Sequence, residues 1–128
     1  MRFWKTDRSQ SASIFTINTS SGMLTFVLPR KDEAVMIGLY HRVEEETNKQ
    51  VLHILSAAGD VNVSYPCPSA TRHSCSIYER TERRTNTMTQ FFQGCRDAAQ
   101  QDQAVLVHCN NSFHRAPLAV ACIMPGLD

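Results

Sequence analysis

A short apolar segment, Ala104 to His108, constrains the fold more than any other part of this chain. It follows the polar stretch Gln100 to Gln103, and its only polar side chain is the last one. A run of about five apolar residues rich in β-branched side chains is typical of a strand that is buried on both faces. Such strands belong to parallel sheets that are covered by helices, so this segment predicts an α/β fold.

The segment Val51 to Leu55 has the same character and leads into a loop of small residues. Between these two strands, apolar residues at helical spacing indicate a helix that Thr85 or Thr87 would cap. The apolar stripe of this helix consists of Met88, Phe91, Phe92, Cys95, Ala98 and Ala99. A second helix is predicted from Asp32 to Asn48, where apolar residues again recur at helical spacing. The alternation of helices and strands predicts a short, mostly parallel sheet with helices on its faces.

Two further strands, Ile14 to Ile17 and Leu24 to Leu28, flank a turn at Ser20 to Gly22 and predict a hairpin or a ragged edge of the sheet. A last helix is expected from Ala116 to Met124. In the intervening region, Asp60 to Arg84, the pattern is weak. It predicts short strands at residues 61–63 and 75–78 and a solvated charged turn at residues 79–84.

The composition fits one domain, because 128 residues of which 42% are hydrophobic suffice for a single core. We expect a loose N-terminal segment, residues 1–13, and one domain over residues 14–128. Thirteen Lys and Arg against twelve Asp and Glu leave a net charge of +1, so no overall field attracts nucleic acid or anionic lipid. No stretch has the apolar continuity of a membrane span. A partner is therefore expected to be recognised at a site.

The five cysteines are an odd number at irregular spacing, which favours thiols in a reducing compartment over a disulfide framework. The N-terminus lacks the pattern of a secretory signal, so we expect a cytoplasmic or nuclear protein. Zinc sites use closely paired ligands, and the nearest approach to such a set is Cys67 with His73 and Cys75. No metal and no cofactor are expected.

The residues after the strand at 104–108 carry the chemistry. Cys109 stands at the carboxyl end of this strand, and Arg115 follows six positions later at the predicted start of a helix. Between a strand end and a helix N-terminus, successive backbone N–H groups form a nest that binds a tetrahedral oxyanion. The same field favours a cysteine thiolate, and an arginine fork binds two phosphoryl oxygens at once. The spacing therefore predicts a phosphate site in which Cys109 is the nucleophile.

With His108 included, the pattern His-Cys-x5-Arg after an apolar strand resembles the signature loop of the protein tyrosine phosphatase superfamily. The order of elements over residues 24–124 is similar to that of its small dual-specificity members. The resemblance implies a metal-free hydrolysis of phosphorylated Tyr, Ser or Thr on proteins through a phosphocysteine intermediate. It implies that Cys109 is the nucleophile, that Arg115 holds the phosphate and that His108 tunes the thiol. It also implies a cradle of backbone N–H groups from Asn110, Asn111, Ser112, Phe113 and His114.

The loop diverges from this family pattern. Ser112 stands where the family usually has Gly, which restricts the backbone, and Ala116 lacks the hydroxyl that assists departure of the thiolate in the second step. The family's general acid is an Asp about thirty residues before the cysteine by resemblance, yet no Asp occurs at residues 61–96. Glu79 and Glu82 are the nearby carboxylates that could protonate a leaving group.

These departures leave two alternatives beside a phosphatase. One is a pseudophosphatase that binds phosphoproteins through the same loop with little or no turnover. The other is an oxyanion reductase of the arsenate type, because Cys-x-x-Ser-x-x-Arg followed by Ala116 and Pro117 also resembles the loop of rhodanese-like phosphatases and arsenate reductases. That fold continues well beyond its cysteine, whereas nineteen residues follow Cys109. The order of elements therefore favours the dual-specificity fold, in a form that is short at its C-terminal end.

Overall fold

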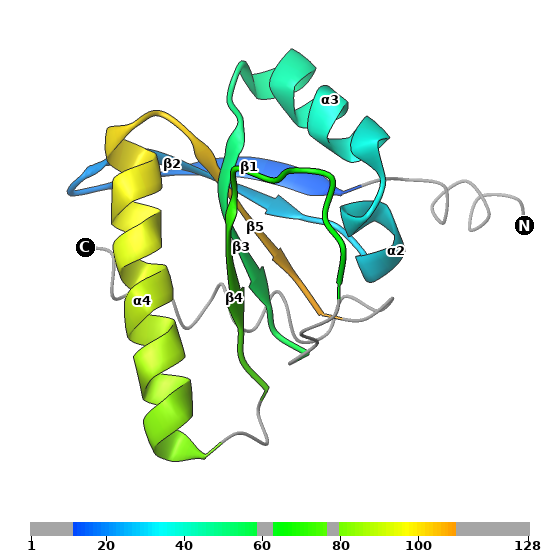
Figure 1. The fold of residues 1–128 in the computed structure, drawn as a ribbon. Helices are drawn as coiled ribbons and strands as arrows, with labels where there is room; N and C mark the ends of the chain where they lie inside the picture. Colours follow the sequence, from blue (N-terminus) through cyan, green and yellow to red (C-terminus); the bar gives the residue numbers. More distant parts are fainter. Residues whose placement is uncertain (1–11, 59–62, 77–79, 110–128) are drawn as a thin grey trace, which may run out of the picture.

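The computed structural model describes residues 12–58, 63–76 and 80–109 (Figure 1). The described strands form one five-stranded sheet with the order β1-β2-β5-β3-β4. Neighbouring strands run parallel except β1, which is antiparallel to β2. The predicted α/β class with a mostly parallel sheet is confirmed. In chain order the elements are β1 (Ser13–Thr19), β2 (Gly22–Leu28), α2 (Lys31–Ala34), α3 (Ile37–Thr47), β3 (Val51–Ser56), β4 (Thr71–Ser74), α4 (Thr81–Gln100) and β5 (Ala104–His108).

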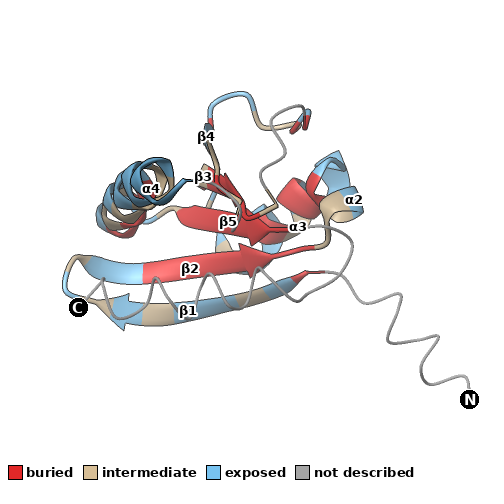
Figure 2. Ribbon diagram, turned by 90° about the horizontal axis from the view of Figure 1, so that it is seen from below, coloured by how far each residue is buried: buried red, intermediate tan, exposed pale blue. Residues whose placement is uncertain are grey.

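The sheet separates two hydrophobic clusters, with α4 on one face and α2 and α3 on the other (Figures 1 and 2). The cluster on the α4 side includes Leu24, Phe26, Leu55, Phe91, Cys95, Val105 and Val107. The cluster on the α3 side includes Val27, Ala34, Leu39, Tyr40, Val43, Ile54 and Leu106. Successive residues of β5 alternate between the two clusters, as the pleat of a strand requires. Each fully buried Val or Leu of this kind stabilises the fold by about 1.5–3 kcal/mol.

The predicted hairpin is confirmed, since β1 and β2 pair from Ser13 opposite Leu28 to Thr19 opposite Gly22. Gly22 has φ +132°, and a Cβ at this position would lie 2.9 Å from the carbonyl oxygen of Ala99. The turn thus requires glycine both for its backbone conformation and for its close approach to the end of α4.

The prediction of one helix from Asp32 to Asn48 is wrong, because the chain breaks between α2 and α3. Met36 is extended, with φ −103° and ψ 127°. The Tyr40 hydroxyl donates to the Ala34 carbonyl at 2.6 Å and so provides a partner at the end of α2. Apolar spacing did not reveal the break, because Ala34 and Leu39 lie in the same buried cluster on either side of it.

Helix α4 starts earlier than predicted. Its N-cap is Arg80 and its first residue is Thr81, so the charged segment expected as a turn is helical from that point, and the prediction is wrong there. Glu82 lies in the first turn, where a negative charge interacts favourably with the helix dipole. The expected caps, Thr85 and Thr87, lie inside the helix. No helix in residues 12–58, 63–76 and 80–109 combines the length and the apolar character that crossing a membrane requires.

The fourth strand also differs from the prediction. β4 occupies Thr71–Ser74, whereas Cys75 and Ser76, the first residues of the predicted strand at 75–78, follow it outside any strand. Val63 is likewise not in a strand. Hydropathy did not indicate β4, because it is a polar strand at the edge of the sheet and half of it is exposed. The expected helix at residues 116–124 and the segment 1–11 lie outside the described residues.

Two histidines join β3, β4 and α4. His53 Nδ1 and His73 Nε2 lie 3.0 Å apart, and the His73 ring meets Phe91 edge-on with ring centroids 5.3 Å apart. Burial lowers the pKa of His53, an effect that the charge of Asp97 opposes. Burial also lowers the pKa of His73 to about 4, and the neighbouring His53 acts in the same direction. Both imidazoles are therefore neutral in the folded protein at pH 7.

Gly94 of α4 packs directly on this pair, and a Cβ there would lie 2.6 Å from His53 Nδ1. We expect Gly94→Ala to lower the free energy of unfolding by about 1–3 kcal/mol, because the imidazole ring would have to move. Gly38→Ala in α3 is a matched control, since nothing lies within 4 Å of the added Cβ. It should be neutral or stabilise by up to about 1 kcal/mol. Urea unfolding of the three proteins measures both effects, and a Gly94→Ala protein as stable as the wild type would contradict the packing.

The same pair predicts sensitivity to acid. The pKa of both histidines is lower in the folded state than the value of about 6.5 expected when unfolded, so the unfolded state binds more protons at acidic pH. Their contribution to stability is present above pH about 6.5 and is lost as the pH falls towards the folded pKa of His73, about 4. Urea unfolding between pH 7 and pH 4 should show this loss, and His73→Gln should reduce it. His41→Gln, at an exposed position of α3, should leave the pH dependence of the wild type in place.

Candidate active site at the carboxyl ends of the parallel strands

The carboxyl ends of β3, β4 and β5 lie side by side at one edge of the sheet. Ser56 of β3 is level with both Ser74 of β4 and His108 of β5. Hydrogen bonds continue one residue beyond the strands: the Ala57 N–H donates to the His108 carbonyl at 2.8 Å, and the Cys75 N–H donates to the Ser56 carbonyl at 3.0 Å. Residues that follow these strands are thereby held at a common edge, where ligand sites of open α/β sheets form.

Cys109 leaves β5 at this edge. Its side chain is 1% exposed and belongs to the cluster on the α4 side of the sheet. Helix α4 begins at the same end of the molecule, with Glu82 exposed in its first turn (Figure 1). Cys109, His108 and Glu82 are the predicted site residues that lie among those that the structure describes. Arg115, the cradle residues Asn110, Asn111, Ser112, Phe113 and His114, and also Ala116 and Glu79, lie outside them.

His108 supports Cys109 from the opposite face of the sheet. Its side chain is fully buried, with Nδ1 2.8 Å from the carbonyl oxygen of Cys109 and Nε2 2.5 Å from the Tyr65 hydroxyl. Because a carbonyl oxygen can only accept, Nδ1 carries a proton and donates to it. In neutral His108, Nε2 then accepts the hydrogen bond of Tyr65. Within the part of the chain that the structure describes, the neighbouring Ser56 Oγ is buried and makes no hydrogen bond, so it does not compete for either ring nitrogen.

Sequence reasoning had given His108 a supporting role, but it missed Tyr65. This residue is buried in the segment before β4, which the sequence left without a clear interpretation. The sequence offered one indication of a buried role, namely that Tyr65 is a single aromatic residue among prolines and small polar residues. Tyr65 and His108 are 43 positions apart in the sequence, and only the folded chain brings them within hydrogen-bonding distance.

The described cysteines other than Cys109 have different environments. Burial raises the pKa of Cys95 to about 12, while Arg96 acts weakly in the opposite direction, so the Cys95 thiol is a core group. Cys75 follows β4 and is separated from Cys109 by β3. Two strand spacings amount to roughly 9–10 Å, beyond the Cα separation that a disulfide tolerates. The described cysteines, Cys67, Cys75, Cys95 and Cys109, form no disulfide with one another.

The structure gives no support to a zinc site at Cys67, His73 and Cys75. His73 turns to His53, and the Cys67 thiol lies 3.6 Å from the Val51 carbonyl oxygen. Within residues 12–58, 63–76 and 80–109, no three metal-ligating side chains come together.

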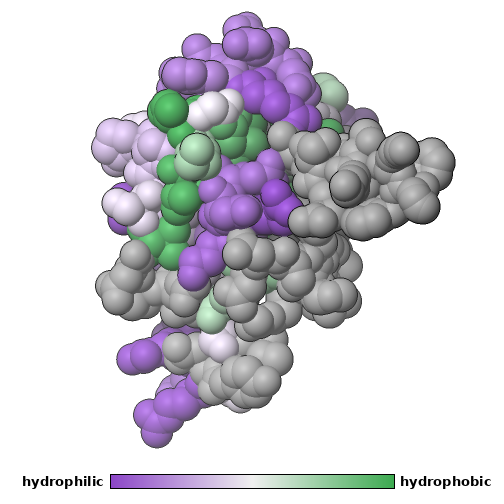
Figure 3. Space-filling model, turned by 90° about the vertical axis from the view of Figure 1, so that its right-hand side faces the viewer, coloured by the Kyte–Doolittle hydropathy of each residue, from purple (hydrophilic) through white to green (hydrophobic). Residues whose placement is uncertain are grey.

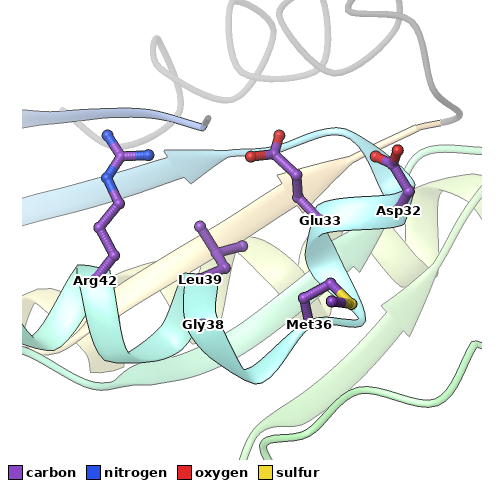
Figure 4. A pocket seen from close by; sticks show the side chains of 6 residues that line it. All are labelled: Asp32, Glu33, Met36, Gly38, Leu39 and Arg42. Atoms are coloured by element: carbon purple, nitrogen blue, oxygen red, sulfur yellow. The ribbon is translucent and has the colours of Figure 1, made fainter. Parts of the chain in front are cut away.

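A separate hollow of about 420 Å³ lies beside α2 and α3 (Figure 4). Residues Val35 to Ile37 are exposed next to it, on a face where hydrophobic and hydrophilic groups mix (Figure 3). Its charged groups pair within the chain, Arg30 with Asp32 and Arg42 with Glu46. The lining consists of Asp32, Glu33, Met36, Gly38, Leu39 and Arg42. It contains neither cysteine nor histidine, so the nucleophile predicted from the sequence is not there.

Comparison with known proteins defines the class of the fold. No protein-family profile matches the sequence, and no curated protein is significantly similar to it in sequence. Among solved structures, the chain is similar to a candidate protein tyrosine phosphatase from Leishmania major, with a TM-score of 0.55 and 12% identity over 92% of this chain and 80% of that chain. At this identity the similarity establishes a protein tyrosine phosphatase-like fold. It supports the resemblance seen in the sequence at the level of the fold.

The hydrogen bond between Tyr65 and His108 can be tested by measuring its contribution to the free energy of unfolding. We expect Tyr65→Phe to lower the free energy of unfolding by about 1–3 kcal/mol, because the ring remains while a buried hydrogen bond is lost. Tyr40→Phe removes a comparable buried bond, the 2.6 Å contact with the Ala34 carbonyl, from the same face of the sheet. Urea unfolding should show losses of similar size for both variants. A Tyr65→Phe protein of wild-type stability would contradict the contact.

Proposed function

We propose that this protein is a cysteine-dependent phosphatase that hydrolyses phosphorylated Tyr, Ser or Thr side chains of proteins through a phosphocysteine intermediate. The observation that carries the proposal is the position of Cys109, directly after the fully buried central strand β5 and with its carbonyl bound by His108. Arg115 follows Cys109 at the spacing of a phosphate-binding loop. The phosphatase-like fold agrees with this proposal.

In the proposed reaction, the Cys109 thiolate attacks phosphorus and displaces the substrate oxygen, which takes a proton. Water then attacks the phosphocysteine, releasing inorganic phosphate and regenerating the thiolate. The N–H groups of residues 110–114 and the Arg115 fork are the groups we assign to the phosphoryl oxygens. For the proton, Glu79 and Glu82 are the proposed donors, since no Asp occurs at residues 61–96.

Two sequence observations favour a second candidate, a phosphoprotein-binding pseudophosphatase. Ala116 offers no hydroxyl to the departing thiolate, and the Asp typical of the family is missing. Both changes slow turnover, and neither removes the backbone donors or Arg115. Binding without efficient hydrolysis would therefore use the same loop. For either activity, we propose phosphorylated proteins of the cytoplasm or nucleus as the partners.

The first test is release of p-nitrophenol from p-nitrophenyl phosphate in fresh reductant, with the pH varied from acidic to neutral. This substrate has a good leaving group and needs little acid catalysis, so it tests the nucleophile alone. We expect hydrolysis by the wild type, complete loss in Cys109→Ser and no change in Cys67→Ser, a matched control at a partly exposed cysteine. Phosphate analogues should still bind Cys109→Ser, whereas Arg115→Ala should lose both binding and hydrolysis.

A folded and reduced wild type that releases no more product than Cys109→Ser would refute the phosphatase. Retained binding of a phosphotyrosine peptide that depends on Arg115 would then identify the pseudophosphatase. Reduction of arsenate that requires both Cys109 and an added thiol would identify the oxyanion reductase instead.

A further inference from the structure

Arg72 is an exposed residue of the edge strand β4, yet its side chain contacts the buried segment behind the candidate active site. The guanidinium carbon lies 5.3 Å from the centroid of the Tyr65 ring. Nη1 donates to the Val63 carbonyl at 3.4 Å, two residues before Tyr65. The cation thus covers the ring and also binds the backbone that carries it.

From Tyr65 the contacts continue to Cys109. The Tyr65 hydroxyl meets His108 Nε2 at 2.5 Å, and His108 Nδ1 meets the Cys109 carbonyl at 2.8 Å. Tyr65 and His108 are buried, with 8% and 0% of their surface exposed. A continuous series of contacts therefore joins a charge at the edge of the sheet to the backbone of Cys109.

We propose that Arg72 is a positioning residue of the candidate active site, which acts by placing its positive charge over the Tyr65 ring and thereby fixes the proton arrangement of His108. The inference rests on the proposed function in that Cys109 is taken as the reacting group. Arg72 does not touch the substrate in this proposal.

The physical basis is the polarisation of the phenol. A cation over the face of an aromatic ring is attracted by its electrons and withdraws density from the hydroxyl, which becomes a better donor. Hydrogen bonds in series strengthen one another, so the Tyr65 bond to Nε2 reinforces the Nδ1–H bond to the Cys109 carbonyl. A positive charge on buried His108 is unfavourable in itself, and the guanidinium on the Tyr65 ring adds to that cost. Both effects favour neutral His108 with its proton on Nδ1.

The other titratable groups near Arg72 are consistent with this arrangement. Tyr40 lies on α3, and burial raises its pKa far above the usual value; Cys67 and Tyr65 act in the same direction, and Arg72 opposes them. The field of Arg72 therefore also reaches Tyr40.

The test compares Arg72→Met, which keeps the length of the side chain without its charge, with Arg72→Lys, which keeps the charge. ¹⁵N NMR of the His108 ring at pH 7 reports the protonation of each nitrogen and does not depend on turnover. In the wild type we expect a neutral ring with its proton on Nδ1. Arg72→Met should shift the Nε2 signal towards the protonated value, and Arg72→Lys should restore the wild-type signal.

Kinetics with p-nitrophenyl phosphate provide the second measurement. Arg72→Met should lower kcat about three- to tenfold with KM little changed, the size that a cation–π contact supports. Arg72→Lys should recover most of the activity. Because Arg72 acts through Tyr65, the double variant Arg72→Met with Tyr65→Phe should be no slower than Tyr65→Phe alone. Arg42→Ala, at an arginine paired with Glu46 on α3, is the control and should match the wild type.

Three results would overturn the inference: wild-type NMR signals and kcat in Arg72→Met, equal impairment of Arg72→Lys and Arg72→Met, or multiplicative losses in the double variant. The first result would exclude any role of Arg72 at the site. The second would exclude a role of its charge, and the third would exclude a role that acts through Tyr65. An inactive wild type whose His108 signals still respond to Arg72 would refute the proposed function and leave the Arg72 network supported.

Discussion

The burial of β5 on both faces is the constraint on which the rest of the structure depends. All five of its residues are fully buried. A strand in this position must have helices on both sides and strands on both edges, which α4, α3, β2 and β3 provide. The burial of His108 also explains its two hydrogen bonds, because a buried imidazole without partners would be costly.

The candidate site follows from where this strand ends. Since β3, β4 and β5 run parallel, their carboxyl ends share one edge, and residues distant in sequence become neighbours there. The alternation of side chains then points His108 to the α3 side of the sheet and places Cys109 in the cluster on the α4 side. The nucleophile proposed here and the residue that supports it are thus held by different halves of the core.

The sequence predicted those elements whose apolar residues recur at a regular local spacing. The strands β3 and β5 and most of α4 have apolar patterns that match their burial, and Cys109 could be placed at a strand end. Strand β4 could not be predicted, because its pairing with β3 satisfies a polar backbone and leaves little trace in hydropathy. Tyr65 and Arg72 were missed for the same reason: their roles depend on contacts with residues far away in the chain.

His108 and Cys109 are joined by a single peptide bond, but their side chains point to opposite faces of the sheet. A small molecule that altered the surroundings of Tyr65 on the α3 side would therefore affect the proposed nucleophile without occupying the proposed phosphate-binding loop. Such a compound would not compete with the phosphoryl group and would need no negative charge of its own. The rear of the central strand thus offers an approach to control that is chemically different from binding at the proposed phosphate site.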